Sequence, residues 1–291
     1  AKNSAWAILL MCSLTGFISA FVENVSTVLI IAPIALALAR KINLNPVKMM
    51  IAIAISSNLQ GTATLIGDPP SMLLAGFTRM NFGDFFLYKG KPSIFFAVEL
   101  GAIASFIVLM FLFRKERRKV KVIPVEKIHS WVPTILLVAL IVLLAASSFF
   151  DTGFTSAAGI ICVVIGIISL IWEKFTNKGG VGELIKSLDW DTALFLVGIF
   201  ILVGSLSLTG WINSIAQLLS NVTGVNIFLG YTLLVFISVI ISAFVDNIPF
   251  LAAMLPVAIQ MADKLNVNPS LFLFGLLIGA SLGGNITPIG A

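Results

Sequence analysis

The stretch SAFVENVSTVLIIAP at residues 19–33 returns later in the chain as SAFVDNIPFLAAMLP at residues 242–256. In each copy an acidic residue and an asparagine interrupt a long apolar run, where a membrane-spanning helix rarely carries a charge. These pairs are Glu23-Asn24 and Asp246-Asn247. A carboxylate placed at the same point of both copies indicates a role that the copies share.

The similarity extends beyond these two stretches. Residues 19–67 align with residues 242–290 at a constant offset of 223 without a gap, and 18 of the 49 aligned positions are identical. The loop KINLNP of the first copy is matched by KLNVNP in the second. Self-similarity of this kind indicates a duplicated structural unit.

The composition places the chain in a membrane. Hydrophobic residues make up 59% of 291 residues and charged residues 11%, and the mean hydropathy is +1.09. Soluble domains are about a quarter charged. Several apolar runs approach the length of about 20 residues that a helix needs to cross a bilayer. The predicted fold class is therefore an all-α polytopic membrane protein.

Metal, cofactor and nucleic-acid functions find no support in the composition. Cys12 and Cys162 lie in apolar runs, and His129 is the only histidine, so no transition-metal ligand set is present. The net charge is +5, but seven of the 18 Lys and Arg residues lie in the loop 114–127 between two apolar segments. This pattern favours a loop facing anionic lipid and not a nucleic-acid surface.

Each unit is predicted to contain a re-entrant helical hairpin followed by a discontinuous transmembrane helix. The acid–asparagine pair marks the hairpin tip, and segments rich in Gly, Thr, Asn and Pro break the next helix. Such polar breaks persist at membrane depth only where protein buries them or where they line a watery cavity. The first repeat, 1–113, is predicted to hold hairpin 4–39, broken helix 47–77 and span 93–113. A basic cytoplasmic loop, 114–130, follows it. The second repeat, 131–291, is predicted to hold spans 131–149, 154–173 and 191–209, hairpin 226–262 and a truncated broken helix, 270–291.

The second repeat is predicted to have inverted topology. Five crossings lie between the two hairpins, and because this number is odd the second hairpin enters from the opposite face. The Lys and Arg residues divide 14 to 4 between the two sides of this topology. The positive-inside rule then makes the loops 40–48, 114–130 and 174–190 cytoplasmic in a multi-pass protein of the cell membrane.

The repeat symmetry also predicts a longer parent protein. Three spans precede the second hairpin, whereas only 18 residues precede the first copy of the repeat. Two complete repeats would require a parent chain of roughly 400–450 residues.

The acidic residues have two interpretations. A carboxylate at the bilayer centre costs about 3 kcal/mol, which favours a role in binding an ion or a proton. Asp246, however, precedes Pro249 as a helix cap would, and the two roles are compatible because a helix begins at a hairpin tip. Asp68 in GDPP either caps the helix that starts at Pro69 or titrates as a third acid.

The tips and breaks together form the candidate site. Amide and carbonyl oxygens coordinate cations such as Na⁺, whereas half-helix N-termini attract anions. Na⁺ is a candidate ligand at Asn24 and Asn247. The candidate substrate- and ion-binding residues are Glu23, Asn24, Ser26, Thr27, Asn58, Gly61, Thr62, Thr64, Gly67 and Asp68 in the first repeat and Asp246, Asn247, Gly284, Asn285, Thr287 and Gly290 in the second.

Four motifs in order resemble the ion transporter superfamily. They are SAFVENVSTVLIIAP, GTATLIGDPP, SAFVDNIPFLAAMLP and GASLGGNITPIGA. The branch they resemble holds the melanosomal P protein, arsenite permeases and NhaD-type Na⁺/H⁺ antiporters, with a citrate-transporter-like domain. The resemblance implies that tips and broken helices form the site, and that a homodimer works by an elevator-type alternating access.

The tips depart from one part of that superfamily. Its divalent-anion carriers have Ser-Asn-Thr at the tips, whereas this chain has Glu23-Asn24-Val25 and Asp246-Asn247-Ile248. The tips are similar to those of the antiporter and P-protein members. Lys and Arg are absent from the tips and breaks, which counts against a dicarboxylate substrate.

The leading hypothesis is a secondary active ion transporter in the lipid bilayer, coupled to H⁺ or Na⁺ and carrying a small inorganic or organic ion. The alternatives are an arsenite or other small-anion efflux permease, a Na⁺-coupled dicarboxylate carrier and a passive channel. No cofactor beyond the coupling ion is expected. An enzyme is disfavoured because no catalytic Ser/His or HExxH arrangement occurs. A soluble ATPase partner stays open, and a nucleic-acid partner is not expected.

Overall fold

The computed structural model describes residues 4–41, 45–116, 130–150, 157–177, 181–186, 188, 190–287 and 290. The predicted cytoplasmic loops 40–48, 114–130 and 174–190 therefore lie partly outside the described residues. Within these ranges the chain is almost entirely helical. The helices are α1 (Ser4–Ser19), α2 (Asn24–Lys41), α3 (Pro46–Gly61), α4 (Pro69–Thr78), α5 (Ile94–Phe113), α6 (Val132–Phe150), α7 (Ala157–Asn177), α8 (Val181–Lys186), α9 (Trp190–Leu208), α10 (Trp211–Thr223), α11 (Ile227–Ser242), α12 (Asn247–Lys264) and α13 (Ser270–Gly284).

The remaining regular structure is small. A 3₁₀ turn, η1 (Gly83–Phe85), precedes the strands β1 (Leu87–Tyr88) and β2 (Lys91–Pro92), which pair antiparallel. This segment joins α4 to α5.

Several helices have the length and composition of membrane spans. In the described part of the chain these are α2, α5, α6 and α7, and a fifth candidate is the pair α9–α10, which is bent by 68°. The helices α1, α11 and α13 are apolar but shorter. The fold-class prediction, an all-α polytopic membrane protein, is confirmed. The re-entrant and inverted arrangement of the repeats stays a prediction.

Local sequence explains where the helices begin. Asn45 caps α3 by accepting a hydrogen bond from the Val47 amide at 2.9 Å, with Pro46 in the first turn. Asn226 caps α11 in the same way through the Leu229 amide at 3.0 Å. Asparagine at the cap and proline at the first helical position are both favoured at helix N-termini.

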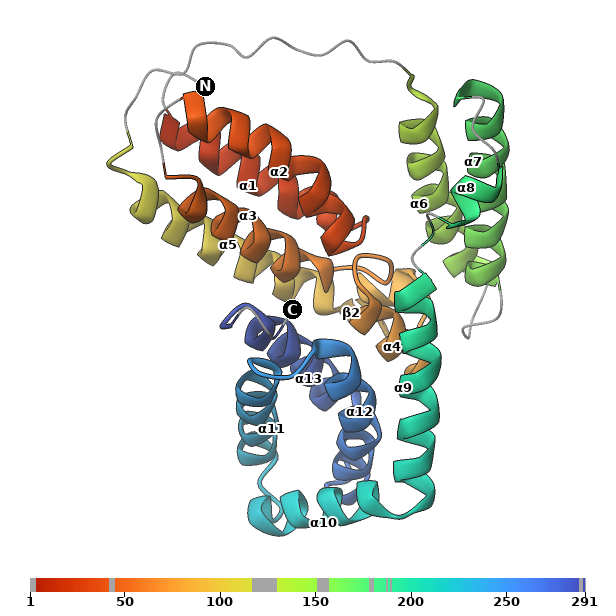
Figure 1. Ribbon diagram of the computed structural model, residues 1–291. Coiled ribbons are helices and arrows are strands. Elements are labelled where there is room, and N and C mark those ends of the chain that lie inside the picture. Colours follow the sequence, from red (N-terminus) through yellow and green to blue (C-terminus); the bar gives the residue numbers. More distant parts are fainter. Residues whose placement is uncertain are drawn as a thin grey trace.

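Two groups of three helices have the same packing. In the first group α1 and α2 pack on each other and on α3, and in the second α11 and α12 pack on each other and on α13. Figure 1 shows the first group in red and orange and the second in blue, meeting near the middle of the molecule. The second group contacts the first sequence unit through α13, which touches α3 and α4, and through α12, which touches α4.

The close approach of α11 and α13 depends on glycine. Gly275, Gly279 and Gly283 lie four residues apart on α13, and a side chain at Gly279 would place its Cβ 2.8 Å from the Ser238 Cβ of α11. Spaced small residues allow helix backbones to approach closely in membranes. In the first group the small residue stands on the other helix, because Gly16 of α1 faces Gln60 of α3.

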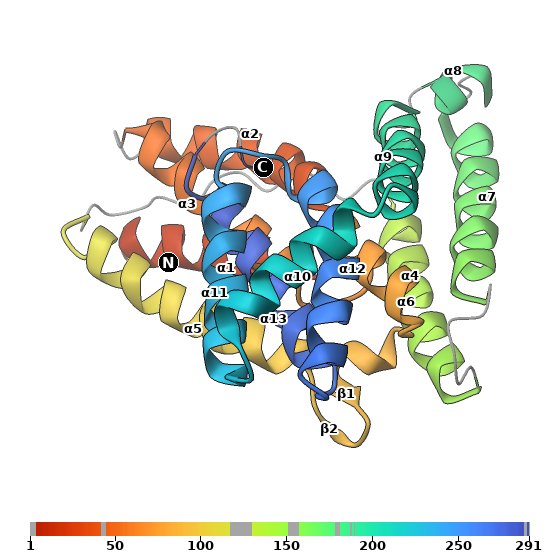
Figure 2. The same ribbon diagram turned by 90° about the horizontal axis from the view of Figure 1, so that it is seen from below.

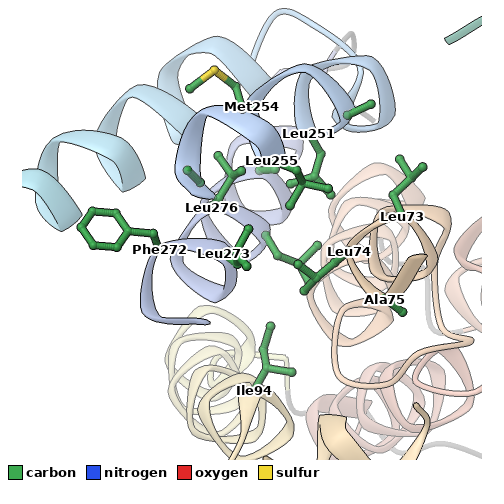
Figure 3. Packing of buried hydrophobic residues seen from close by; sticks show 14 of the residues in the cluster. Leu73, Leu74, Ala75, Ile94, Leu251, Met254, Leu255, Phe272, Leu273 and Leu276 are labelled. Carbon is green, nitrogen blue, oxygen red and sulfur yellow. The ribbon is translucent and has the colours of Figure 1, made fainter. Parts of the chain in front are cut away.

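The main core joins the second group to α4 and α5, while α1, α2 and α3 bury a smaller core of their own. Leu74 of α4, Leu251 and Leu255 of α12 and Leu276 of α13 are completely buried, and Figure 3 shows them converging, with Ile94 of α5 below them. This core holds α4 against α12 and α13.

The remaining helices lie around this core. Figure 2 shows α10 lying across α11 and α12, with α6, α7 and α8 set to one side. The buried residues of α10 share one face, and Gln260 of α12 donates to Asn213 of α10 at 2.6 Å. The Gly83 amide donates to Ser148 Oγ of α6 at 2.8 Å, which attaches α6 to the segment before α5.

Candidate functional site

The two acids at the helix turns cap the helices that follow them. Glu23 accepts a hydrogen bond from the Ser26 amide at 2.9 Å, at the start of α2. Asp246 accepts one from the Ile248 amide at 2.8 Å, at the start of α12. Glu23 is half-buried and Asp246 is exposed. Each carboxylate therefore lies on the positive end of a helix dipole.

Asp68 has the same local role in the break between α3 and α4. Its carboxylate accepts from the Ser71 amide at 3.0 Å, and Pro69 and Pro70 fill the first turn of α4. Asp68 differs from the tip acids because it is only 2% exposed. Capping, one of the two roles that the sequence left open for Asp68, is present.

Asn24 links the first tip to the broken helix. Its Oδ1 accepts from Ser19 Oγ at 2.8 Å, and its Nδ2 donates to Asn58 Oδ1 at 3.2 Å. The Ser57 hydroxyl donates to the Asn24 carbonyl at 3.3 Å. The asparagine is therefore fixed by polar groups of α1 and α3.

Asn247 has an equivalent place in the second tip. Its side-chain amide is hydrogen-bonded with Ser242 Oγ, the partner that corresponds to Ser19. The Asn247 side-chain amide is oriented with its nitrogen toward two backbone carbonyls. It donates to the Ala280 oxygen at 3.0 Å and to the Gly290 oxygen at 3.1 Å. Asn247 is 7% exposed.

Threonines of the breaks bind the carbonyls of the tips. Thr64 Oγ1 donates to the Ala20 carbonyl, and Thr287 Oγ1 donates to the Ala243 carbonyl. Donors and acceptors are related by the same offset of 223 residues. Thr62, by contrast, donates to the carbonyl of Leu59 at 3.2 Å within its own turn.

Two predicted residues of the first tip stand apart from this network. The Ser26 side chain is exposed, while its amide caps onto Glu23 as described above. Thr27 is completely buried and donates to the Val22 carbonyl at 3.2 Å. Both residues hold the turn itself.

The glycine spacing that the two repeats share has a steric cause in both breaks. A Cβ at Gly67 would collide with the Gly61 carbonyl oxygen and lie 2.9 Å from that of Ala20. A Cβ at Gly290 would lie 2.9 Å from the Gly284 Cα and collide with the Ser242 carbonyl oxygen. At Gly61 a side chain would collide with Asn24. Each break therefore packs backbone against backbone.

The two repeats meet at Asn58 and Ser281. Asn58 Nδ2 donates to the Ser281 carbonyl at 3.2 Å, and Ser281 Oγ donates to the Asn58 carbonyl at 3.1 Å. Asn285 Nδ2 also donates to the Ser281 carbonyl, at 2.9 Å. Asn24, Asn58 and Asn285 thereby belong to one hydrogen-bonded network that crosses between the repeats.

The charges of the site are all negative. In the part of the chain that the structure describes, no Lys or Arg lies in residues 20–23, 62–68 or 243–246, and no ion pair to Glu23, Asp68 or Asp246 is present there. The described residues also hold no group of three or more His, Cys, Asp or Glu side chains. The oxygen atoms of the site come mainly from amides, hydroxyls and the backbone.

Sequence reasoning missed four serines in this network. Ser19 and Ser242 were detectable because they are identical in the two copies of the repeat. Ser57 and Ser281 were not, since their equivalents are Ala280 and Asn58. The repeat therefore identifies the tip serines but not those on the broken helices.

Comparison with known proteins settles the family. The model of the citrate transporter family matches residues 1–279. The chain belongs to the citrate transporter family. As a member of it, the chain is 30% identical over 297 residues to an uncharacterized transporter of Mycobacterium tuberculosis, an alignment that covers 100% of this chain and 68% of the relative.

Two further relatives of this citrate transporter family member come from other organisms. An uncharacterized transporter of Synechocystis is 28% identical over 316 residues, with 100% of this chain and 69% of the relative covered. The human P protein is 25% identical over 371 residues, with 100% and 44% covered. The predicted relation to the branch that holds the P protein is confirmed, and the chain is a multi-pass membrane transporter protein.

Proposed function

We propose that this protein is a secondary active transporter that carries a cation and is coupled to H⁺ or Na⁺. The observation that carries the proposal is the capping of three helix N-termini by the protein's own carboxylates. Glu23, Asp68 and Asp246 accept backbone N–H groups at 2.9, 3.0 and 2.8 Å.

The negative charge of the capping carboxylates favours a cationic substrate over an anionic one. A helix N-terminus attracts anions because it carries about half a positive charge and unpaired N–H groups. Here that charge already faces a carboxylate in each case. An anionic substrate would meet three negative groups and no Lys or Arg in the described tips and breaks. A cation would meet complementary charge and oxygen ligands.

The network supplies ligands suited to a hard monovalent cation. Amide and carbonyl oxygens coordinate hard cations. Asn24 contacts the side-chain oxygen of Asn58, and Asn247 lies beside the backbone carbonyls of Ala280 and Gly290. In this proposal Na⁺ binds near these asparagines, and Glu23 and Asp246 exchange the cation for protons. Asp68, which is buried, is the third acid that can take part.

Movement is proposed to occur by alternating access. Equivalent residues of the two repeats bond to each other at Asn58 and Ser281, and transporters built from inverted repeats bind substrate where the repeats meet. An elevator-type motion of a homodimer, as the family resemblance implies, is part of this proposal.

The experiment is a current measurement on a solid-supported membrane with protein in liposomes. Na⁺ and Li⁺ jumps at several pH values should evoke currents and release protons, whereas arsenite and dicarboxylates should not. The Asp263→Asn variant changes an exposed acid near the end of α12 and should keep full current. Current that requires an anion and is indifferent to Na⁺ and Li⁺ would refute cation transport.

Citrate transport is a second candidate, because the family model that matches residues 1–279 describes a citrate transporter. Citrate carries several negative charges, so it would need cations bound at the carboxylates to offset their repulsion. Citrate-evoked current that grows with the concentration of Na⁺ or a divalent cation would favour this candidate over cation exchange.

A further inference from the structure

A cavity separate from the candidate site lies in the first repeat. It is partly open, has a volume of about 400 Å³ and lies between α1, α3 and α5, which run side by side in Figure 1. None of the residues proposed above for ion binding lines it. Its polar lining is made by Ser13, Ser56, Gln60, Glu99 and Ser105.

Glu99 is the charged group of this cavity. It lies five residues after the start of α5, a helix of 20 mostly apolar residues. Its carboxylate accepts a hydrogen bond from Gln60 Nε2 at 3.4 Å, and no Lys or Arg of the described chain forms an ion pair with it. An acid in a membrane helix is costly and marks a functional position by default.

Gln60 supplies a second acceptor. It is 8% exposed, and its Oε1 is buried without a hydrogen-bond partner among the described residues. A buried polar atom left unpaired costs about 1–3 kcal/mol. Because Gln60 lines the cavity, a ligand bound there is the available source of a donor for this oxygen.

Packing does not require a glutamine at this position. The equivalent residue in the second repeat is Gly283, and α13 packs there on α11 without a side chain. In the first repeat Gly16 makes room, because a Cβ at that position would lie 2.9 Å from the Gln60 Cγ. The first repeat therefore accommodates a side-chain amide at a position where the second repeat has only a glycine.

We propose that this cavity binds a primary ammonium group attached to an apolar chain. The two acceptors belong to side chains in contact, because the Gln60 amide nitrogen donates to Glu99, and in this proposal one –NH₃⁺ group binds both. Ser13 and Ser105 offer further hydroxyls, and Phe106 and Leu109 line the space for the apolar chain. The ligand is either a free alkylamine or the ethanolamine headgroup of a lipid.

The test is calorimetric titration of the purified protein in phosphatidylcholine nanodiscs with hexylammonium. Saturable binding is expected, and hexyltrimethylammonium, which has the charge but no N–H donor, should bind at least about tenfold more weakly. Hexanol, which lacks the charge, should be weaker by a similar factor. These factors correspond to the loss of one or more charge-assisted hydrogen bonds.

Variants separate the site from partitioning into lipid. Glu99→Gln and Gln60→Leu should each weaken hexylammonium binding about tenfold, and Ala102→Phe should abolish it by filling the cavity that Ala102 lines. Asp263→Asn, an exposed acid elsewhere, should leave binding unchanged. Equal affinity in the wild type and all three cavity variants overturns the proposal, as does equal binding of the primary and quaternary amines.

A lipid arm identifies the source of the ammonium group. Phosphatidylethanolamine in the nanodisc competes with hexylammonium in the wild type, but not in Glu99→Gln, if the lipid is the ligand. Without competition the ligand is a free amine. Binding is read directly, so this result stands whether or not the protein proves to transport cations.

Discussion

Asn58 and Ser281 stand 223 positions apart, at equivalent places in the two repeats, and each side chain donates a hydrogen bond to the backbone carbonyl of the other. Reciprocal contact between equivalent residues is the mark of an isologous interface, such as that of a two-fold dimer. Here the interface lies within one chain, and both residues are buried. The polar network of the site is therefore also the joint between the repeats.

This joint should contribute measurably to stability. Ser281→Ala removes one hydrogen bond and should lower the free energy of unfolding by about 1 kcal/mol. Asn58→Ala also leaves the Asn24 amide without its partner, so we expect about 1–3 kcal/mol. Denaturant unfolding in detergent measures both. Ser147→Ala, which removes a hydroxyl bonded within its own helix, is the control and should change little.

The glycines of the breaks should tolerate no side chain. Gly67→Ala and Gly290→Ala each force a methyl group onto backbone atoms, and we expect a loss of more than about 2 kcal/mol, as in other overpacked cores. Gly76→Ala in α4 meets no atom within 4 Å and should stabilise by about 0.5–1 kcal/mol. Thermal unfolding of the three variants, measured side by side, checks this. A similar loss for all three would contradict the steric explanation.

Capping and ion binding can be separated at Asp246. Asparagine caps helices about as well as aspartate, so Asp246→Asn should keep the bond from the Ile248 amide and the melting temperature. It should nevertheless lose the cation-evoked current, because its charge is gone. Asp246→Ala should lose the current and about 1 kcal/mol of stability.

Current and melting temperature measured on the same preparations decide between the two roles of Asp246. Full current in Asp246→Asn would leave capping as its only role. Loss of current in Asp246→Ala alone would have the same meaning.

The hydrogen bonds from the break threonines to the tip carbonyls should contribute differently to the free energy of unfolding in the two repeats. Thr64→Val leaves the buried Ala20 carbonyl without a donor and should cost about 1–3 kcal/mol. Thr287 is only half-buried, so water can replace its hydroxyl and Thr287→Val should cost less. Urea unfolding midpoints compare the two variants, with the exposed Thr209→Val as control. A larger effect at Thr287 would show that the second break is drier than its exposure indicates.

The repeat made the helix breaks predictable. Acid–asparagine pairs and Gly- and Pro-rich segments interrupt apolar runs, and the structure ends α1, α3 and α11 at these points. Capping by Asp68 and Asp246 was one of the roles that the sequence left open, because Pro69 follows Asp68 directly and Pro249 lies three residues after Asp246. The orientation of the hairpins in a membrane stays a prediction.

The polar pair of the cavity could not be predicted in the same way. Glu99 lies outside the duplicated 49 residues, so the repeat says nothing about it. Gln60 lies inside them, but its partner depends on which face of α3 meets α5, and that contact arises from long-range packing. No local pattern of residues encodes it.

The two repeats also differ in which helix of an equivalent packed pair, α1–α3 or α11–α13, carries the glycine at the contact. In the first, Gly16 of α1 faces the Gln60 side chain of α3, and in the second Gly283 of α13 faces the backbone carbonyl of Val239 and the Ser242 Cβ of α11, so the glycine stands on a different helix in each pair. A hybrid that pairs α1 with α13 would place glycine opposite glycine, whereas the Gln60 side chain of α3 would meet α11 without a facing glycine. The two repeats of this protein are therefore not interchangeable at this helix crossing.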